Sequence, residues 1–159
     1  MECWVWLCEE SGYIPSDIFK KVVKCVPIAS VEAIIITKNG LLFLKRNNEP
    51  AKGKWWFPGG RIRKEESLED ALKREVKEET GLVLTRYRLI NVYSRVFPER
   101  HDVTIAYLCS CGKGDVVLNE EHSEYRFLKV IPPDLHAYLK ETIQDSKWWN
   151  NHDRSDFVL

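Results

Sequence analysis

A glycine and a group of acidic side chains occupy residues 60–82, GRIRKEESLEDALKREVKEETGL. If this segment contains a helix, Glu75, Glu78 and Glu79 fall within roughly 100° of arc on one side of it. Carboxylates this close repel one another unless a cation lies between them. All-oxygen ligands select a hard ion, so the spacing predicts a site for Mg²⁺ or Mn²⁺. The alternative is a solvated acidic helix face, but it does not account for Gly60, for Glu66 or for the strand upstream.

The helix that must carry these carboxylates has recognisable ends. Ser67 is followed three residues later by Asp70, which is typical of an N-cap and a first helical turn. Leu68, Ala71, Leu72 and Val76 then recur at helical spacing and predict the buried face. Gly81 is placed to end the helix in the left-handed conformation.

The rest of the chain predicts an α/β fold. Strands are expected at residues 28–37 and 41–45, joined by an Asn39-Gly40 turn, and the glycines of Pro58-Gly59-Gly60 permit close backbone approach to a ligand. Further apolar stretches follow at residues 87–96, 103–111, 116–118 and 125–130. A last helix is expected from Pro132-Pro133 to about Gln144. A mixed sheet between helices is the natural outcome of this pattern.

Composition sets limits on the class of protein. The chain has 159 residues, enough for one domain, and its 24 Lys and Arg balance 24 Asp and Glu, so nothing favours a nucleic-acid polymer as partner. Its five cysteines lack C-x-x-C spacing and are expected to be reduced, as in a cytoplasmic protein. Residues 1–8 lack the basic region and long apolar core of a signal peptide or membrane span, so no membrane association is expected.

Residues 60–82 resemble the signature of the Nudix hydrolases, G-x5-E-x7-R-E-U-x-E-E-x-G-U, where U is aliphatic, and every specified position is met. The resemblance implies an α/β/α sandwich with a mixed β-sheet between helices. It implies a metal-dependent hydrolase in which Gly59, Glu75, Glu78 and Glu79 hold the ion. Arg74 would orient the catalytic carboxylates, with Glu66 near the metal or its waters.

Three further segments look like GDP-mannose mannosyl hydrolases within that superfamily. They are residues 18–32, the run KRNNEPAKGKWWFPGGR at 45–61, and EEHSEYRFL at 120–128. The last resembles a loop carrying a catalytic histidine, which makes His122 a candidate general base with a pKa near the working pH, and adds Glu124 as a candidate metal ligand. The alternative is that His122 and Glu124 are ordinary solvent-exposed residues of a polar loop.

The two resemblances differ on the bond that is cut. Mannosyl hydrolases lack some of the glutamates and attack the sugar carbon, whereas this chain keeps Glu75, Glu78 and Glu79, as do Nudix enzymes that attack phosphorus. The leading expectation is hydrolysis of GDP-mannose or a similar NDP-sugar. The alternatives are pyrophosphate cleavage of ADP-ribose, an NDP-sugar or a (d)NTP, and a nucleotide-binding module without activity.

Substrate contacts and assembly complete the expectations. Arg46 and Arg61 flank the glycine turn and could hold a diphosphate, the alternative being ordinary surface arginines. Glu32 is either a sugar contact or an edge carboxylate, and Trp55 and Trp56 could stack on a base or sugar. We expect an N-terminal arm at 1–17, a Nudix domain at 18–147 and a tail at 148–159. The apolar start at residues 4–7 favours a homodimer over an arm folded back onto its own sheet.

Overall fold

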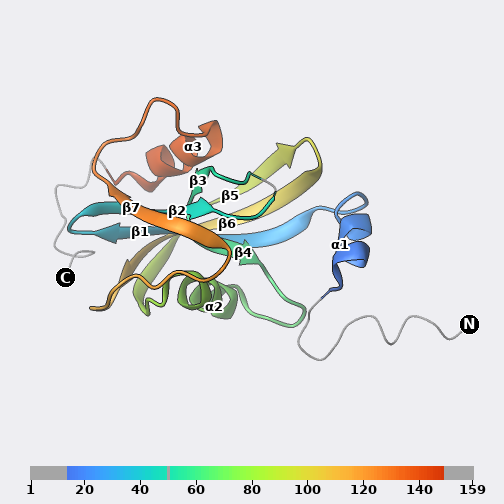
Figure 1. Cartoon of the computed structure of the whole chain (residues 1–159), viewed down its shortest axis with the longest axis horizontal. Helices are drawn as coiled ribbons and strands as arrows, with labels where there is room; N and C mark the ends of the chain where they lie inside the picture. Colours follow the sequence, from blue (N-terminus) through green and yellow to red (C-terminus); the bar gives the residue numbers. More distant parts are fainter. Residues whose placement is uncertain (1–13, 50, 149–159) are drawn as a thin grey trace, which may run out of the picture.

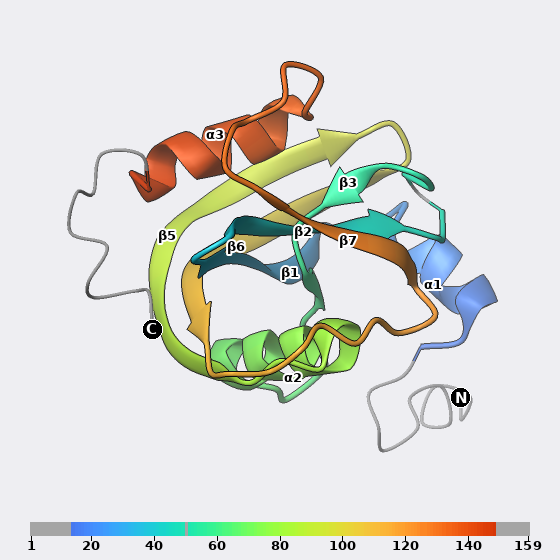
Figure 2. The ribbon, with the colours of Figure 1, turned by 60° about the vertical axis from the view of Figure 1, so that its left-hand side comes forward.

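The computed structural model describes residues 14–49 and 51–148. Its centre is a mixed β-sheet held between helices, which confirms the predicted α/β/α sandwich. In Figure 2, α2 lies below the sheet and α3 lies above it. The sheet has the strand order β3-β2-β1-β6-β5, with β4 paired to β1 and β7 paired to β2.

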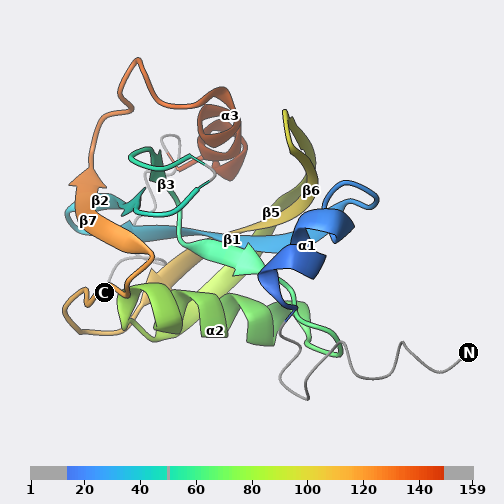
Figure 3. The same ribbon diagram turned by 45° about the vertical axis from the view of Figure 1, so that its right-hand side comes forward.

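The first half of the chain follows the predicted elements closely. β1 is Ile28–Thr37 and β2 is Gly40–Arg46. The turn between them is Lys38-Asn39, one residue earlier than the expected Asn39-Gly40, because Gly40 already pairs with Thr37. The short strands β3 and β4 are Trp55–Trp56 and Gly59–Arg61. A helix that the sequence did not indicate, α1 at Ser16–Val22, precedes them, so the expected boundary at residue 17 falls inside a helix. Figure 3 shows α1 beside the end of β4.

The second half contains the long outer strands and the last helix. β5 is Leu84–Phe97, β6 is Arg100–Cys111 and β7 is His122–Leu128. The expected apolar stretch at 116–118 is not a strand, and Val117 is 67% exposed there. The last helix, α3, is Ala137–Ser146 and begins later than expected, because residues 132–135 form a turn and His136 is the N-cap.

β1 divides the core into two parts because its side chains alternate between the faces of the sheet. Val31, Ala33 and Ile35 pack against the apolar face of α2. Ile34 and Ile36 pack on the opposite side, where Leu139 and Ile143 of α3 cover them. β1 runs parallel to β6 and antiparallel to β2 and β4, so the sheet is mixed. The chain path from β1 to α3 can be followed in Figure 1.

No helix in the described part of the chain is long and apolar enough to cross a membrane.

Candidate active site

α2, Leu68–Thr80, places the glutamates, and its ends form as predicted. The Ser67 hydroxyl accepts a hydrogen bond from the Asp70 backbone N–H at 3.1 Å, and Gly81 ends the helix with φ at 70°. Ala71, Leu72 and Val76 are fully buried against the sheet. Because this apolar face is fixed, Glu75 and Glu79 on its flank are turned toward strand β4.

The glycines of β4 allow the two carboxylates to touch the backbone. The Gly59 N–H donates to Glu79 Oε2 at 2.8 Å. A Cβ at residue 60 would lie 2.5 Å from Glu75 Oε1, and one at residue 59 would lie 2.3 Å from the Val31 carbonyl oxygen. Gly59 also has φ at +153°, which side chains rarely adopt. Position 59 therefore needs glycine, and position 60 could carry a side chain only if the Glu75 carboxylate moved. The PGG turn and the acidic helix are thus in direct contact.

Arg74 ties the other glutamates together. Its guanidinium donates to Glu66 at 2.6 and 2.9 Å, to Glu75 at 2.6 Å and to Glu78 at 3.3 Å. It also reaches the Arg61 carbonyl at 3.0 Å. At a separation of eight residues, Glu66 and Arg74 are too far apart to pair along one helix. Glu66 instead precedes the helix and turns back toward Arg74, so the two bind directly. The hydrogen bonds from Arg74 lower the pKa of the Glu66 carboxyl.

His122 joins the site from β7. It lies opposite Arg46 in the pairing of β7 with β2, and its Nε2 is 3.8 Å from Glu79 Oε1. Its Nδ1 is 3.2 Å from Asn119 Oδ1. Burial and the nearby Arg46 charge lower the pKa of His122 to about 4, so the imidazole is neutral at neutral pH. This pKa is lower than the expected value near the working pH.

The carboxylates nearest the glycines have the character of cation ligands. Burial raises the pKa of the Glu75 carboxyl and raises that of Glu79 well above its usual range, because a charged carboxylate there has lost solvent without gaining a full counter-charge. A hard divalent ion would supply that charge, so Glu75 and Glu79 fit Mg²⁺ or Mn²⁺.

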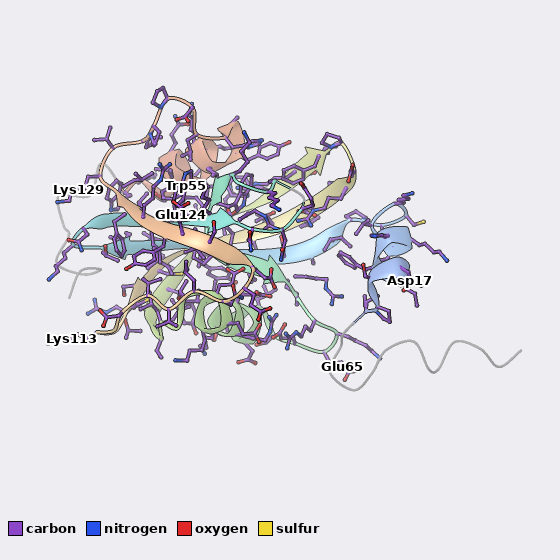
Figure 4. All side chains as sticks on the ribbon, in the orientation of Figure 1. Asp17, Trp55, Glu65, Lys113, Glu124 and Lys129 are labelled. Atoms are coloured by element: carbon purple, nitrogen blue, oxygen red, sulfur yellow. The ribbon has the colours of Figure 1, made fainter. Side chains whose placement is uncertain are left out.

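The other two expected metal ligands, Glu78 and Glu124, do not lie with Glu75 and Glu79 but pair with basic side chains. Glu78 is half-exposed and pairs with Arg63 and Arg74. Glu124, labelled in Figure 4, pairs with Lys45 at 2.6 Å, and β2, which carries Lys45, lies between β7 and β3. Within the described residues no three His, Cys, Asp or Glu side chains form a ready ligand group. Binding through all three helix glutamates requires Glu78 to turn away from Arg63.

A cavity of about 100 Å³ adjoins the glycine strand on the α3 side of the sheet. Arg46, Trp56, Gly59 and Gly60 line it, together with polar and aromatic side chains of β1, β5 and β6. Because Glu79 binds Gly59 and Glu75 touches Gly60, the cavity and the carboxylates meet at these two residues.

Glu32 lies in this cavity wall, on the central strand β1, so the alternative of an edge carboxylate is wrong. It is 3% exposed, accepts bonds from Arg95 Nη1 at 2.9 and 3.1 Å, and accepts another from Trp56 Nε1 at 2.8 Å. Burial raises the pKa of its carboxyl, although the Arg95 charge acts in the opposite direction.

The arginines that flank the glycine turn lie in different surroundings. Arg46 lines the cavity, and burial lowers the pKa of its guanidinium. Arg61 lies over the Phe19 ring of α1 at 5.3 Å. Only Arg46 of this pair lines the cavity, so the two arginines do not form a single clamp.

Several polar side chains of the cavity were missed from sequence. They are Ser30, Arg95, Arg100, Asp102 and Thr104. The sequence did contain a signal for a buried charge. Tyr93, Arg95 and Phe97 share one face of β5, and Arg95 is a charged residue between two aromatic ones. Such a residue is buried only if it has partners, and those partners come from strands distant in sequence.

A mixed sheet between helices, with a glycine strand facing an acidic helix, is an arrangement whose carboxylates can hold a divalent ion. The NUDIX domain family model matches residues 26–148, so the chain belongs to the Nudix family and is a Nudix hydrolase. Members of this family generally use divalent metal ions such as Mg²⁺.

Curated relatives align over most of the chain. The "low-salt glycan biosynthesis protein Agl8" of Haloferax volcanii is 29% identical over 135 residues, covering 80% of this chain and 86% of the relative. The "ADP-ribose pyrophosphatase" of Methanocaldococcus jannaschii is 33% identical over 128 residues, covering 79% of this chain and 76% of the relative.

Solved structures agree with the fold. The MutT protein from Methanosarcina mazei superimposes with a TM-score of 0.65 at 31% identity, covering 79% of this chain and 96% of that one. A MutT Nudix hydrolase from Burkholderia pseudomallei gives a TM-score of 0.68 at 27% identity, covering 76% and 98%.

Proposed function

We propose that this Nudix hydrolase cleaves a nucleoside diphosphate linked to another group, with GDP-mannose or a similar NDP-sugar as the leading substrate. The observation that carries the proposal is the meeting of cavity and carboxylates at Gly59-Gly60. A nucleoside in the cavity would place its diphosphate beside Glu75 and Glu79. A substrate of this class needs both a pocket for its organic part and a charged site for its phosphates.

The site residues divide this work. Glu75, Glu78, Glu79 and the Gly59 carbonyl would hold Mg²⁺ or Mn²⁺, which would supply positive charge to the diphosphate and make the attacking water more acidic. Arg46 in the cavity wall offers a positive charge to the phosphates. Arg74 fixes Glu66 and Glu75 in place. A glutamate or the neutral imidazole of His122 takes the proton from the attacking water.

The names of the relatives support different substrates. The Haloferax relative is named for glycan biosynthesis, which favours a nucleotide-sugar, as does the resemblance to mannosyl hydrolases in three segments. The Methanocaldococcus relative is named as an ADP-ribose pyrophosphatase, which favours attack at phosphorus, as do the intact glutamates. Pyrophosphate cleavage of ADP-ribose, an NDP-sugar or a (d)NTP is therefore the second candidate.

A substrate screen tests the proposal. NDP-sugars, ADP-ribose, dinucleotides and NTPs are each incubated with Mg²⁺ or Mn²⁺ and the products are separated by chromatography. Turnover of an NDP-sugar with less activity on the others supports the leading substrate. Tight binding of one compound without turnover of any would replace the hydrolase with a nucleotide-binding module.

Hydrolysis in ¹⁸O-labelled water identifies the bond that is cut. Attack at the anomeric carbon gives GDP and mannose with the label in the sugar, and it predicts strong dependence on His122. Attack at phosphorus gives GMP and mannose 1-phosphate with the label in a phosphate. Label in phosphate, together with unchanged activity of His122→Ala, would replace the leading proposal with a general pyrophosphohydrolase.

The homodimer and the cytoplasmic location stay predictions. Residues 4–7, on which the dimer argument depends, lie outside the described residues. Light scattering at micromolar concentration measures the assembly directly, and a monomeric mass would contradict the dimer.

A further inference from the structure

The cavity contains buried charges that the hydrolytic reaction does not require. Glu32, Arg95 and Asp102 are 3%, 1% and 3% exposed, and all three line the cavity wall. Charged residues are rarely buried unless they are paired, and each pair adds a desolvation cost. Because these buried charges line a cavity and cost free energy, we expect them to recognise the ligand that binds there.

Arg95 and Asp102 lie directly opposite each other in the antiparallel pairing of β5 with β6, so their side chains share the α3 face of the sheet. Each is nevertheless bound elsewhere. Arg95 donates to Glu32 from Nη1, and to Thr142 and the Tyr138 carbonyl from Nη2. Asp102 accepts from Arg100 at Oδ2.

This arrangement leaves one donor and one acceptor unused. Among the described residues, Arg95 Nε and Asp102 Oδ1 are buried without a hydrogen-bond partner. Each such atom carries a desolvation cost that a suitable ligand group would remove. The cavity wall therefore lacks one acceptor for Arg95 and one donor for Asp102.

The two groups are held in place before any ligand binds. The Arg95 guanidinium lies 4.8 Å from the Tyr93 ring centroid and 5.5 Å from that of Tyr138, in addition to its bonds with Glu32. Arg100 is different, because its side chain is 31% exposed at the cavity. A small movement of Arg100 can thus uncover Asp102 without deforming the sheet.

We propose, building on the function proposed above, that Asp102 and Arg95 are the residues that select the base of the nucleotide, and that this base is guanine. Asp102 Oδ1 accepts the adjacent N1–H and N2–H donors of guanine, using its two lone pairs, while Arg95 Nε–H donates to O6. Trp56 and Phe97, whose ring centroids are 6.2 Å apart and whose planes are tilted by 56°, line the same cavity and offer aromatic surface to one side of the base.

The other bases satisfy this pair of groups less well. Adenine and cytosine each present an amino group beside an unprotonated ring nitrogen, so they offer no second adjacent donor for Asp102. Uracil has one N–H between two carbonyl groups, and one of these would face the carboxylate. Because a polar group left unpaired in a buried site is costly, the mismatch lowers affinity.

Binding of nucleoside diphosphates without metal tests the assignment. GDP, ADP, CDP and UDP are titrated by calorimetry in EDTA, so that hydrolysis does not interfere. We expect GDP to bind about 10-fold or more tightly than the others. In Asp102→Asn, which keeps the shape but loses the charge, GDP affinity falls about 10- to 100-fold and the preference is lost.

Arg100→Gln is the matched control. It breaks the same ion pair with Asp102 but keeps both carboxylate oxygens, so the order GDP over the other diphosphates is retained. Thermal melting of both variants verifies that they fold. Equal binding of all four diphosphates by the wild type, or an unchanged preference in Asp102→Asn, would overturn the base assignment alone. Failure of all four to bind in EDTA would also overturn the base assignment, whereas the proposed function is tested separately by the substrate screen with Mg²⁺ or Mn²⁺.

Discussion

At the scale of single residues, the signature glutamates have different surroundings although they share one helix. Glu79 is 4% exposed and bound to the Gly59 N–H, whereas Glu78 is half-exposed and paired with arginines. The sequence spacing placed both on one flank, but it could not distinguish them. That distinction depends on where β4 passes, and β4 is positioned by its pairing with β1.

Glu79→Gln should abolish most activity while stabilising the metal-free fold. The amide still accepts from Gly59 N–H, but it carries no buried charge, so the melting temperature in EDTA should rise. Activity should fall by about 10²- to 10⁴-fold because metal stabilisation of the transition state is lost. Glu69→Gln, on the exposed side of the same helix, should change neither property appreciably. Near-normal turnover of Glu79→Gln would remove the metal-site assignment.

Arg74→Lys tests whether the hydrogen bonds from Arg74 to the glutamates stabilise the fold. A lysine cannot reach Glu66, Glu75 and the Arg61 carbonyl together, because its ammonium is a single point charge. The free energy of unfolding should fall by about 2 kcal/mol. Urea denaturation measures it. Arg63→Lys is the control, since Arg63 reaches Glu78 at 3.5 Å and its side chain is 40% exposed. Equal loss in both variants would contradict a special role for Arg74.

At the scale of elements, local patterns were sufficient where a segment carries its own signals. The ends of α2 and the β1–β2 turn were predicted because a cap, a left-handed glycine and an Asn-Gly pair act within a few residues. α1 was missed because its residues 16–22 include no buried side chain, so no apolar period marks it. The cavity could not be predicted, since its wall needs the register of β1, β5 and β6.

Gly60→Ala tests the contact between β4 and α2. The new Cβ would lie 2.5 Å from Glu75 Oε1, so the Glu75 carboxylate must move. No backbone atom is among the closest contacts, so the fold should accept the alanine. We expect a folded protein with strongly reduced Mg²⁺-dependent activity, measured by turnover and by thermal melting. Gly114→Ala is the control, because its Cβ would meet Leu82 at 3.7 Å, an ordinary contact. Full activity of Gly60→Ala would show that the position of Glu75 is not critical.

At the scale of the molecule, one short strand, β4, contacts both the cavity on one face of the sheet and the carboxylates on the other. The cavity lies on the α3 side and the carboxylates come from α2, and Gly59-Gly60 belongs to both. A nucleoside diphosphate bound in the cavity would extend its phosphates past β4 toward the glutamates. The binding of nucleotide and the binding of metal should therefore be coupled, and the coupling must be reciprocal.

Calorimetry with GDP can measure this coupling. Mg²⁺ should raise the affinity of the wild-type protein for GDP by about 5- to 150-fold relative to EDTA, because the ion screens the diphosphate from Glu75 and Glu79. In Glu79→Gln the same addition should have a much smaller effect, which separates coupling in the protein from the association of Mg²⁺ with free GDP. GDP should in turn raise the affinity for Mg²⁺ by the same factor. An equal Mg²⁺ effect in wild type and Glu79→Gln would mean that the cavity and the glutamates bind independently, and that the nucleotide does not reach across Gly59-Gly60.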